Sequence, residues 1–176
     1  MIEAGRRNFL ALGALGLVAA CGFGRPAPEV PLGADGRPLP RLYTITDEEA
    51  ALIPGRMLEG LNSLRTAARA PSVAPDALLA SAAATHARDM SVQNRPWHFG
   101  SDGSTPLDRL NRVGYRGALV GEAISETYED DLTTLAAWAE DPETRAVLLD
   151  PRATRVGLAW FQEPEGKIWW TLVLGA

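Results

Sequence analysis

The chain has 176 residues, 46% of them hydrophobic and 22% charged, and its formal net charge at pH 7 is −5. This charge balance does not favour nucleic acid or an anionic membrane surface as a binding partner. Cys21 is the single cysteine, so an intramolecular disulfide is excluded and an exported chain of this kind must rely on its apolar core.

The first 20 residues are typical of an export signal that is removed from the folded protein. Arg6 and Arg7 form a positive start, and the apolar run Phe9–Ala20 is shorter than the ~20 residues of a membrane span. The segment Arg6–Leu10 resembles a twin-arginine signal, and an ordinary secretory signal is the alternative.

The segment Val18–Cys21 resembles a lipobox, in which the cysteine is acylated and becomes the mature N-terminus. The alternative for Cys21 is a free thiol in a cleaved peptide. Stable anchoring needs about two acyl chains at ~0.8 kcal/mol per methylene, and a lipoprotein cysteine normally carries more than one. We therefore expect a lipid-anchored protein on the periplasmic or outer side of the cell envelope. An aspartate directly after the cysteine resembles a signal for retention at the inner membrane. Gly22 stands at that position, so placement in the outer membrane is permitted if the source has two membranes.

The domain organisation follows from composition. Residues 21–45 hold the lipidated N-terminus and a glycine- and proline-rich stretch that cannot bury a core and is typical of a tether. Residues 46–176 are long enough for one domain with a sizeable core. We predict a signal peptide over 1–20, the anchor and tether over 21–45, and the domain over 46–176.

Two helices are expected in the first half of the domain. Thr46–Glu49 has the spacing of a capping box and predicts a helix start, and Pro54 is expected to interrupt or restart that helix. Pro75 and Asp76 open a second helix. Its core-facing stripe is predicted from residues three or four apart, namely Leu79, Ala82, Ala83, His86 and Met90.

The second half alternates helix and strand signals. Helix starts are expected at Thr105, Asp130 and Asp141, a helix stop at Gly114, a strand over Leu119–Ile124, and a hairpin of Arg155–Phe161 with Lys167–Leu174. The last strand is apolar on both faces, which implies cover on both sides. The predicted fold is therefore α+β, a three-layer α-β-α sandwich with a small, mainly antiparallel central sheet flanked by helices.

The most distinctive stretch carries four short motifs in order. They are Trp97-His98-Phe99-Gly100-Ser101-Asp102-Gly103, Asp108-Arg109-Leu110, Gly114-Tyr115 and Gly121-Glu122. Their order and spacing resemble the bacterial branch of the CAP superfamily (cysteine-rich secretory proteins, antigen 5, pathogenesis-related 1; SCP-like domains). The resemblance covers roughly residues 58–174 and implies the same three-layer fold.

The resemblance also implies a cleft described by two histidines and two acids. His98 matches one histidine and Glu122 one acid, whereas Thr144 stands where the second histidine would be and Asp141 is the nearest match to the second acid. Trp97, beside His98, is the aromatic residue that we would test for contact with a ligand. These five residues form the predicted cleft.

The residues themselves leave the chemistry open. A histidine partner would lower the pKa of Glu122, and such a pair suits either proton transfer or a structural ion pair, of which we favour the second. One histidine with scattered carboxylates is a weak zinc site, so no metal or other cofactor is expected. His86 is expected to be a hydrogen-bonded core histidine, and Asp141 a helix cap.

The sequence is compatible with three functions. The first is a non-enzymatic, lipid-anchored binding domain; the resemblance implies a lipid, another small hydrophobic ligand or an envelope protein as its partner. The second is a hydrolase with His98 as general base, which no nucleophile motif in the sequence supports. The third is a weak metal-binding module.

Overall fold

The computed structural model describes residues 42–176. The predicted signal peptide, the predicted acylation site Cys21 and the tether up to residue 41 lie outside the described residues. The helices are α1 (Asp47–Ala67), α2 (Ala77–Gln93), α3 (Pro106–Val113), α4 (Asp131–Glu140) and α5 (Pro142–Leu148), and the strands are β1 (Ala74–Pro75), β2 (Leu119–Thr127), β3 (Arg155–Gln162) and β4 (Ile168–Gly175). None of the helices described has the length and apolar character needed to cross a membrane.

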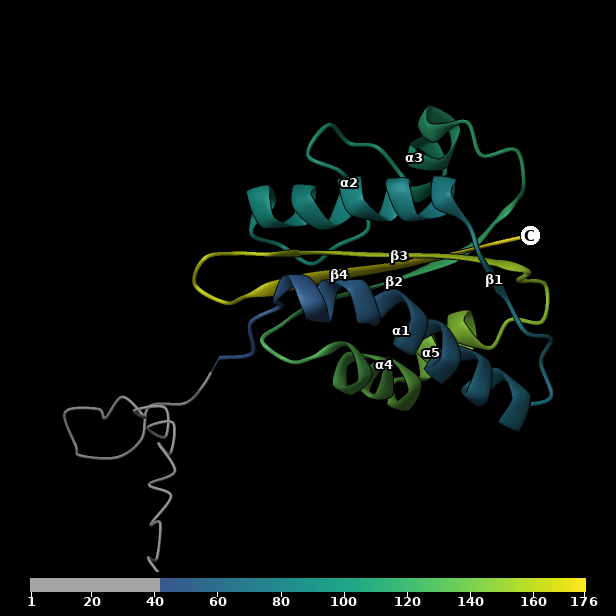
Figure 1. Cartoon of the computed structure of the whole chain (residues 1–176). Coiled ribbons are helices and arrows are strands. Elements are labelled where there is room, and N and C mark those ends of the chain that lie inside the picture. Colours follow the sequence, from purple (N-terminus) through teal and green to yellow (C-terminus); the bar gives the residue numbers. More distant parts are fainter. Residues whose placement is uncertain (1–41) are drawn as a thin grey trace, which may run out of the picture. The chain divides into compact units, whose positions relative to one another are not determined.

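The four strands form one sheet in the order β1-β3-β4-β2. β4 pairs antiparallel with both β3 and β2, while β1 adds a two-residue parallel pairing to β3. Helices α2 and α3 cover one face of the sheet, and α1, α4 and α5 cover the other (Figure 1). The predicted α+β, three-layer sandwich is confirmed.

The central strand β4 explains why both faces are covered. All eight of its residues are buried, and successive side chains point to opposite faces of the sheet. Trp170 and Leu172 join the apolar cluster beneath α1, α4 and α5. Trp169 and Val173 pack instead against residues of α2 and α3. The alternating apolar side chains predicted for this strand therefore pack against the helices on both faces and join the three layers.

Most predicted helix ends agree with the structure because local side chains cap them. Asp76 accepts the backbone N–H groups of Leu78 and Leu79 at the start of α2, at 2.9 and 3.0 Å. Thr105 and Asp108 form a full capping box on α3, which ends at Gly114 in the left-handed conformation.

The expectation for Pro54 was wrong. Helix α1 runs through this proline as one helix of 21 residues. The core-facing residues Ile53, Met57 and Leu61 are all buried, and their packing outweighs the ~3 kcal/mol that a proline costs inside a helix. Strand β2 also extends to Thr127, beyond the predicted end at Ile124, and β1 is too short to leave a periodic signal in the sequence.

A buried arginine connects the end of α1 to the segment between α5 and β3. The Arg65 side chain is fully buried and donates hydrogen bonds to four backbone carbonyls. Those carbonyls belong to Pro71, Leu148, Asp150 and Ala153, at 2.6, 2.6, 3.0 and 3.2 Å. One side chain thus satisfies carbonyl groups of two loops and of the last residue of α5, which would otherwise be buried without partners.

Replacing Arg65 with alanine is expected to destabilise the domain by at least about 2 kcal/mol, because several carbonyls lose their donor and a cavity opens. Urea unfolding followed by tryptophan fluorescence measures the change. The exposed Arg116→Ala variant is the control and should stay within about 0.5 kcal/mol of the parent. Equal stability of the two variants would contradict this account of Arg65.

Candidate functional site

The centre of the candidate site is the carboxylate of Glu122 on the edge strand β2. The residue is only 7% exposed, and its neighbours come from α2, α3 and the loop between them. Arg109 of α3 donates from Nη2 to both carboxylate oxygens, at 2.9 and 2.8 Å. Because Arg109 is itself only 4% exposed, the two residues form a buried ion pair.

His98 completes this pair from the loop that follows α2. Its Nδ1 lies 2.9 Å from Oε1 of Glu122. An ionised carboxylate only accepts hydrogen bonds, so Nδ1 is the donor, and Nε2 has no hydrogen-bond partner within residues 42–176. Just over half of the His98 side chain is exposed, at 52%. Arg109 also donates to the His98 carbonyl at 3.1 Å, and so holds both partners in place.

His86 lies on the inner side of the same carboxylate. It is fully buried on α2, and its Nε2 donates to the Trp97 carbonyl at 2.9 Å. The same nitrogen is 3.7 Å from Oε1 of Glu122. Its Nδ1 has no hydrogen-bond partner among the described residues. The predicted core histidine is therefore confirmed, but it also borders the site.

The charges of the cluster follow from burial and pairing. Burial by itself would raise the pKa of Glu122, but the hydrogen bond from His98 and the positive charge of Arg109 outweigh it and lower that pKa. Burial lowers the pKa of His86. Glu122 is thus ionised and His86 neutral near pH 7, and the contact between them is not an ion pair.

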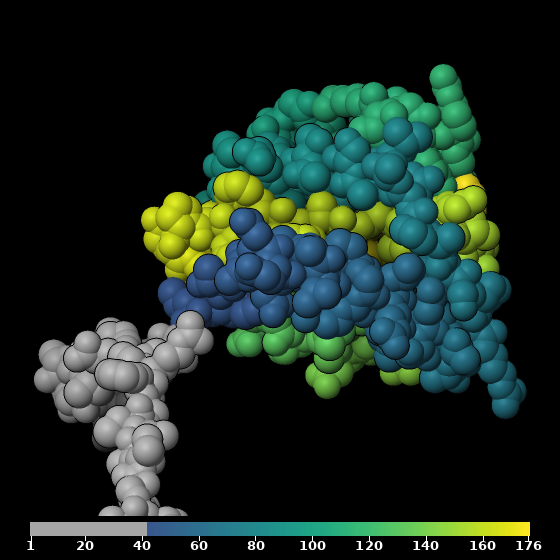
Figure 2. All heavy atoms as spheres, in the orientation of Figure 1, coloured from purple at the N-terminus to yellow at the C-terminus, as the bar shows by residue number. Residues whose placement is uncertain are grey.

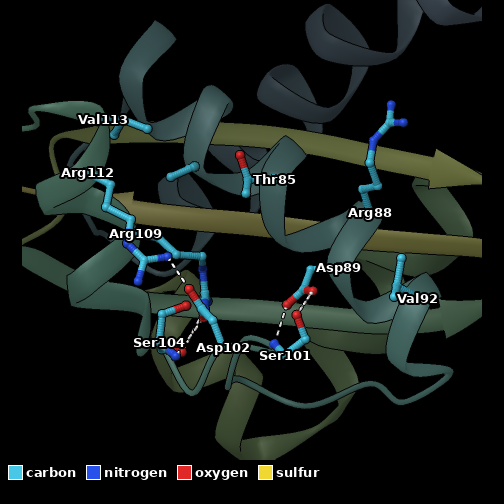
Figure 3. Close-up of a pocket in the computed structure, with 11 residues that line it drawn as sticks. Thr85, Arg88, Asp89, Val92, Ser101, Asp102, Ser104, Arg109, Arg112 and Val113 are labelled. Carbon is cyan, nitrogen blue, oxygen red and sulfur yellow. Dashed lines mark hydrogen bonds and ion pairs between the residues drawn. The ribbon is translucent and has the colours of Figure 1, made fainter.

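A pocket of about 340 Å³ adjoins the cluster between α2, α3 and the loop before α3 (Figure 3). Arg109 lines this pocket and at the same time holds Glu122, whereas His98 and Glu122 do not line it. The pocket is lined by Ala82, Thr85, Arg88, Asp89, Val92, Ser101, Asp102, Ser104, Arg109, Arg112 and Val113.

The acids of this pocket are already paired. Asp89 accepts from the backbone N–H and the hydroxyl of Ser101, at 2.7 and 2.6 Å. Asp102 accepts from Arg112 at 2.6 Å and from the backbone N–H of Ser104 at 2.9 Å. Figure 3 shows these bonds tying the loop to the two helices, so both carboxylates shape the loop.

Trp97 is part of the framework of this loop. Its indole N–H donates to Gln93 at 2.7 Å, and the guanidinium of Arg95 lies over the ring, 4.0 Å from the centroid. Phe99 meets the same ring edge to face at a centroid distance of 5.5 Å. Because Arg95 covers one face of the indole, Trp97 offers a ligand only part of its surface.

The other two residues of the predicted cleft lie elsewhere. Asp141 caps α5 by accepting the backbone N–H groups of Glu143 and Thr144, at 3.0 and 2.9 Å. The Thr144 hydroxyl donates to the Trp138 carbonyl at 2.6 Å. Helix α5 lies on the sheet face opposite α2 and α3 (Figure 1). The structure thus brings His98 and Glu122 together and gives Asp141 and Thr144 no polar contact with them.

Arg109 was not among the site residues predicted from the sequence. A signal was present, because Arg109 precedes the apolar Leu110 on a short capped helix, and a buried guanidinium needs a buried acid. Residues 42–176 contain no group of three or more His, Cys, Asp or Glu side chains that could hold a metal ion.

Comparison with known proteins supports the same fold and family. Residues 58–174 match the family described as "CAP: Cysteine-rich secretory protein family". The fold is similar to that of an outer surface protein from Borrelia burgdorferi, with a TM-score of 0.63, 14% identity, and coverage of 78% of this chain and 98% of that one. A search of curated proteins found no match.

Two longer bacterial proteins contain a similar fold. An extracellular protein with an SCP domain from Bacillus anthracis gives a TM-score of 0.64 at 24% identity over 75% of this chain. A cysteine-rich secretory protein from Staphylococcus aureus gives 0.61 at 12% identity over 82% of it. The present chain spans only 44% and 45% of those proteins, so the likeness concerns the fold of one domain.

Replacing Arg109 with methionine is expected to cost about 3–5 kcal/mol of stability at pH 7, because it leaves the Glu122 carboxylate buried without its cation. The double variant Arg109→Met/Glu122→Gln removes both charges and should recover more than half of that loss. Urea unfolding of the parent, the single and the double variant measures both effects. A loss below about 1 kcal/mol in the single variant would contradict the buried pair.

The unfolding free energy is expected to fall as the solution is acidified, in two stages. The pKa of His86 is lowered on folding, so the unfolded state takes up protons first below its ordinary value of 6.5. The pKa of Glu122 is also lowered, so a second loss begins below its ordinary value of 4.5. In His86→Gln the first stage should flatten while the second remains, as measured by urea unfolding at a series of pH values. An unchanged profile would show that His86 is not the group responsible.

Proposed function

The chain belongs to the cysteine-rich secretory protein (CAP) family, and from this premise we propose that it is an exported, non-enzymatic binding domain of the cell envelope whose site is centred on His98. The observation that carries the proposal is a half-exposed imidazole whose Nδ1–H is held by a buried, ionised carboxylate. Such an imidazole presents a single oriented Nε2 atom to a ligand.

Glu122 acts as a positioning group in this arrangement. Both of its oxygens are engaged by Arg109, and one of them also accepts from His98. The carboxylate therefore has little capacity left to take a proton or to bind a ligand directly. Its effect is exerted through His98, whose ring orientation it fixes.

The same pair of residues would also orient a catalytic base, and the groups around His98 bear on which of the two functions is better supported. A hydrolase needs a nucleophile or a positioned water within hydrogen-bond reach of that base. The hydroxyl of Ser101, nearest to His98 in sequence, is bonded to Asp89 at 2.6 Å, and Ser104 is only 5% exposed. No hydroxyl in residues 42–176 forms a hydrogen bond with the His98 side chain. Within this range the side chain forms a hydrogen bond only with the carboxylate of Glu122. Binding is therefore the better-supported function.

The surface around His98 favours a ligand with both apolar and polar parts. Phe99 is 48% exposed beside it, and Val92, at 77% exposed, lies on the wall of the adjoining pocket. A lipid, another small hydrophobic molecule or an apolar patch of an envelope protein would bury these side chains and use the polar atom of His98. The lipobox at Cys21 and the tether would hold the domain near such partners.

The test compares ligands recovered with the protein from its own cell envelope. The acylated full-length chain and its His98→Ala variant are purified in detergent, and bound lipids and cross-linked proteins are identified by mass spectrometry. Leu52→Ala is the control, since Leu52 is exposed on α1 over the opposite face of the sheet. We expect His98→Ala to recover about tenfold less of one specific ligand than the parent does. This corresponds to a loss of about 1.4 kcal/mol of binding free energy.

Two outcomes would contradict this function. Equal recovery from the parent and His98→Ala would remove His98 from the binding site. Hydrolysis of peptide or ester substrates by the parent, abolished in His98→Ala and retained in Leu52→Ala, would instead make the protein a hydrolase.

A further inference from the structure

A second recess lies at the opposite edge of the sheet from Glu122. It is an apolar groove of about 430 Å³ whose walls come from α1 and α2 and whose floor is β3. Figure 2 shows β3 as a yellow strip left uncovered between the blue α1 and the teal α2. The groove is lined by Pro54, Met57, Leu58, Pro75, Asp76, Ala77, Ala80, Val156, Gly157, Leu158 and Leu172.

The floor of the groove is an open strand edge. Among the described residues 42–176, β3 pairs on its outer side only with the two residues of β1, in the register Ala74–Arg155 and Pro75–Val156. The N–H of Asp76 donates to the Val156 carbonyl at 2.8 Å, which shows that Val156 points its backbone groups outward. Since outward and inward residues alternate along a strand, Leu158 also points its N–H and carbonyl outward.

The same alternation places the backbone groups of Trp160 outward. Further along, the Gln162 side chain bonds to the Tyr43 carbonyl and the Ile45 N–H, at 2.8 and 2.9 Å, and ties down the chain there. Between that point and β1, the outward groups of Leu158 and Trp160 have no hydrogen-bond partner within residues 42–176. An unpaired strand edge is a template for another strand.

The sequence explains why β1 stops so early. Asp76 is already the N-cap that turns the chain into α2, so the chain leaves the sheet directly after Pro75. The parallel strand therefore ends after two residues, and the groove begins beside that point.

We propose that this groove binds an extended, apolar segment of a partner protein, which adds to the free edge of β3 as a short strand between α1 and α2. Alternate side chains of that segment would pack on Met57, Leu58 and Leu172 in the groove. Asp76 is the one charged residue of the lining, so a lysine or arginine of the segment next to β1 would complement it.

The strand edge favours a peptide over an acyl chain. Hydrocarbon would fill the apolar walls but would leave the N–H and carbonyl of Leu158 covered and unpaired, which disfavours it because a buried backbone group without a partner is costly. A peptide backbone satisfies both groups while its side chains bury the same walls. This proposal does not use His98 and stands independently of the proposed function.

The test uses the whole chain with Cys21→Ser, which prevents acylation, and a synthetic probe, acetyl-Lys-Val-Thr-Val-Thr-Val-amide. Hydrogen exchange of the Leu158 and Trp160 amides is followed by NMR as the peptide is added. We expect exchange at these amides to slow at least about tenfold at saturation. The matched control is the same peptide N-methylated at alternate amides, which keeps the side chains and removes half of the backbone donors; it should give no protection.

Two variants locate the binding. Leu158→Pro removes the outward N–H at a position where an edge strand tolerates proline, and should weaken binding of the probe at least about tenfold. Ala80→Lys obstructs the groove from α2 without touching the strand and should do the same, which keeps the test valid if the proline variant unfolds. Leu52→Ala should bind as the parent does.

Other outcomes overturn the proposal. These are equal affinity for the N-methylated peptide, binding that leaves the Leu158 amide unprotected, or no binding at millimolar peptide. Decanoate that occupies the groove and displaces the peptide without protecting the edge amides would assign the groove to a lipid instead.

Discussion

The ion pair between Arg109 and Glu122 is the interaction on which the arrangement of the site depends. Both side chains are nearly inaccessible to water, so neither charge is tolerable without the other. The guanidinium also holds the His98 carbonyl, which fixes the loop that carries the imidazole. Three elements, β2, α3 and the loop after α2, are thereby joined at one carboxylate. This buried centre therefore fixes the orientation of the exposed His98 ring.

The layered fold separates the two candidate binding regions. Because β4 is central and buried on both faces, the two sides of the sheet are closed by helices, and the accessible parts of the sheet are its edges. The edge at β2 carries Glu122 and the imidazole of His98. The edge at β3 carries the apolar groove and an unpaired strand. One region is polar and tightly oriented, and the other is apolar with unpaired main-chain groups, so the ligands proposed for the two regions differ in chemistry.

The departures from the family pattern have structural consequences. Thr144 stands where the resemblance places a second histidine, and its hydroxyl is used within the junction of α4 and α5. Asp141, the nearest match to the second acid, is occupied as the cap of the same short helix. What remains at the β2 edge is a single exposed imidazole with a buried carboxylate behind it. This composition is the basis of the proposal that the site recognises one polar group of a ligand.

The sequence alone determined the features that depend on neighbouring residues. Caps at Asp76, Thr105 and Asp141 set helix starts, and the two-sided apolar pattern of β4 required a layer on each face, because both effects act over a few residues. Tertiary structure decided what depends on distant packing. Burial of one face of α1 keeps the chain helical at Pro54. The packing of α2 on the sheet places Nε2 of His86 3.7 Å from Oε1 of Glu122. The pairing of Arg109 with Glu122 was equally beyond sequence spacing, since the desolvation that forces two charges together exists only once the helices have packed on the sheet.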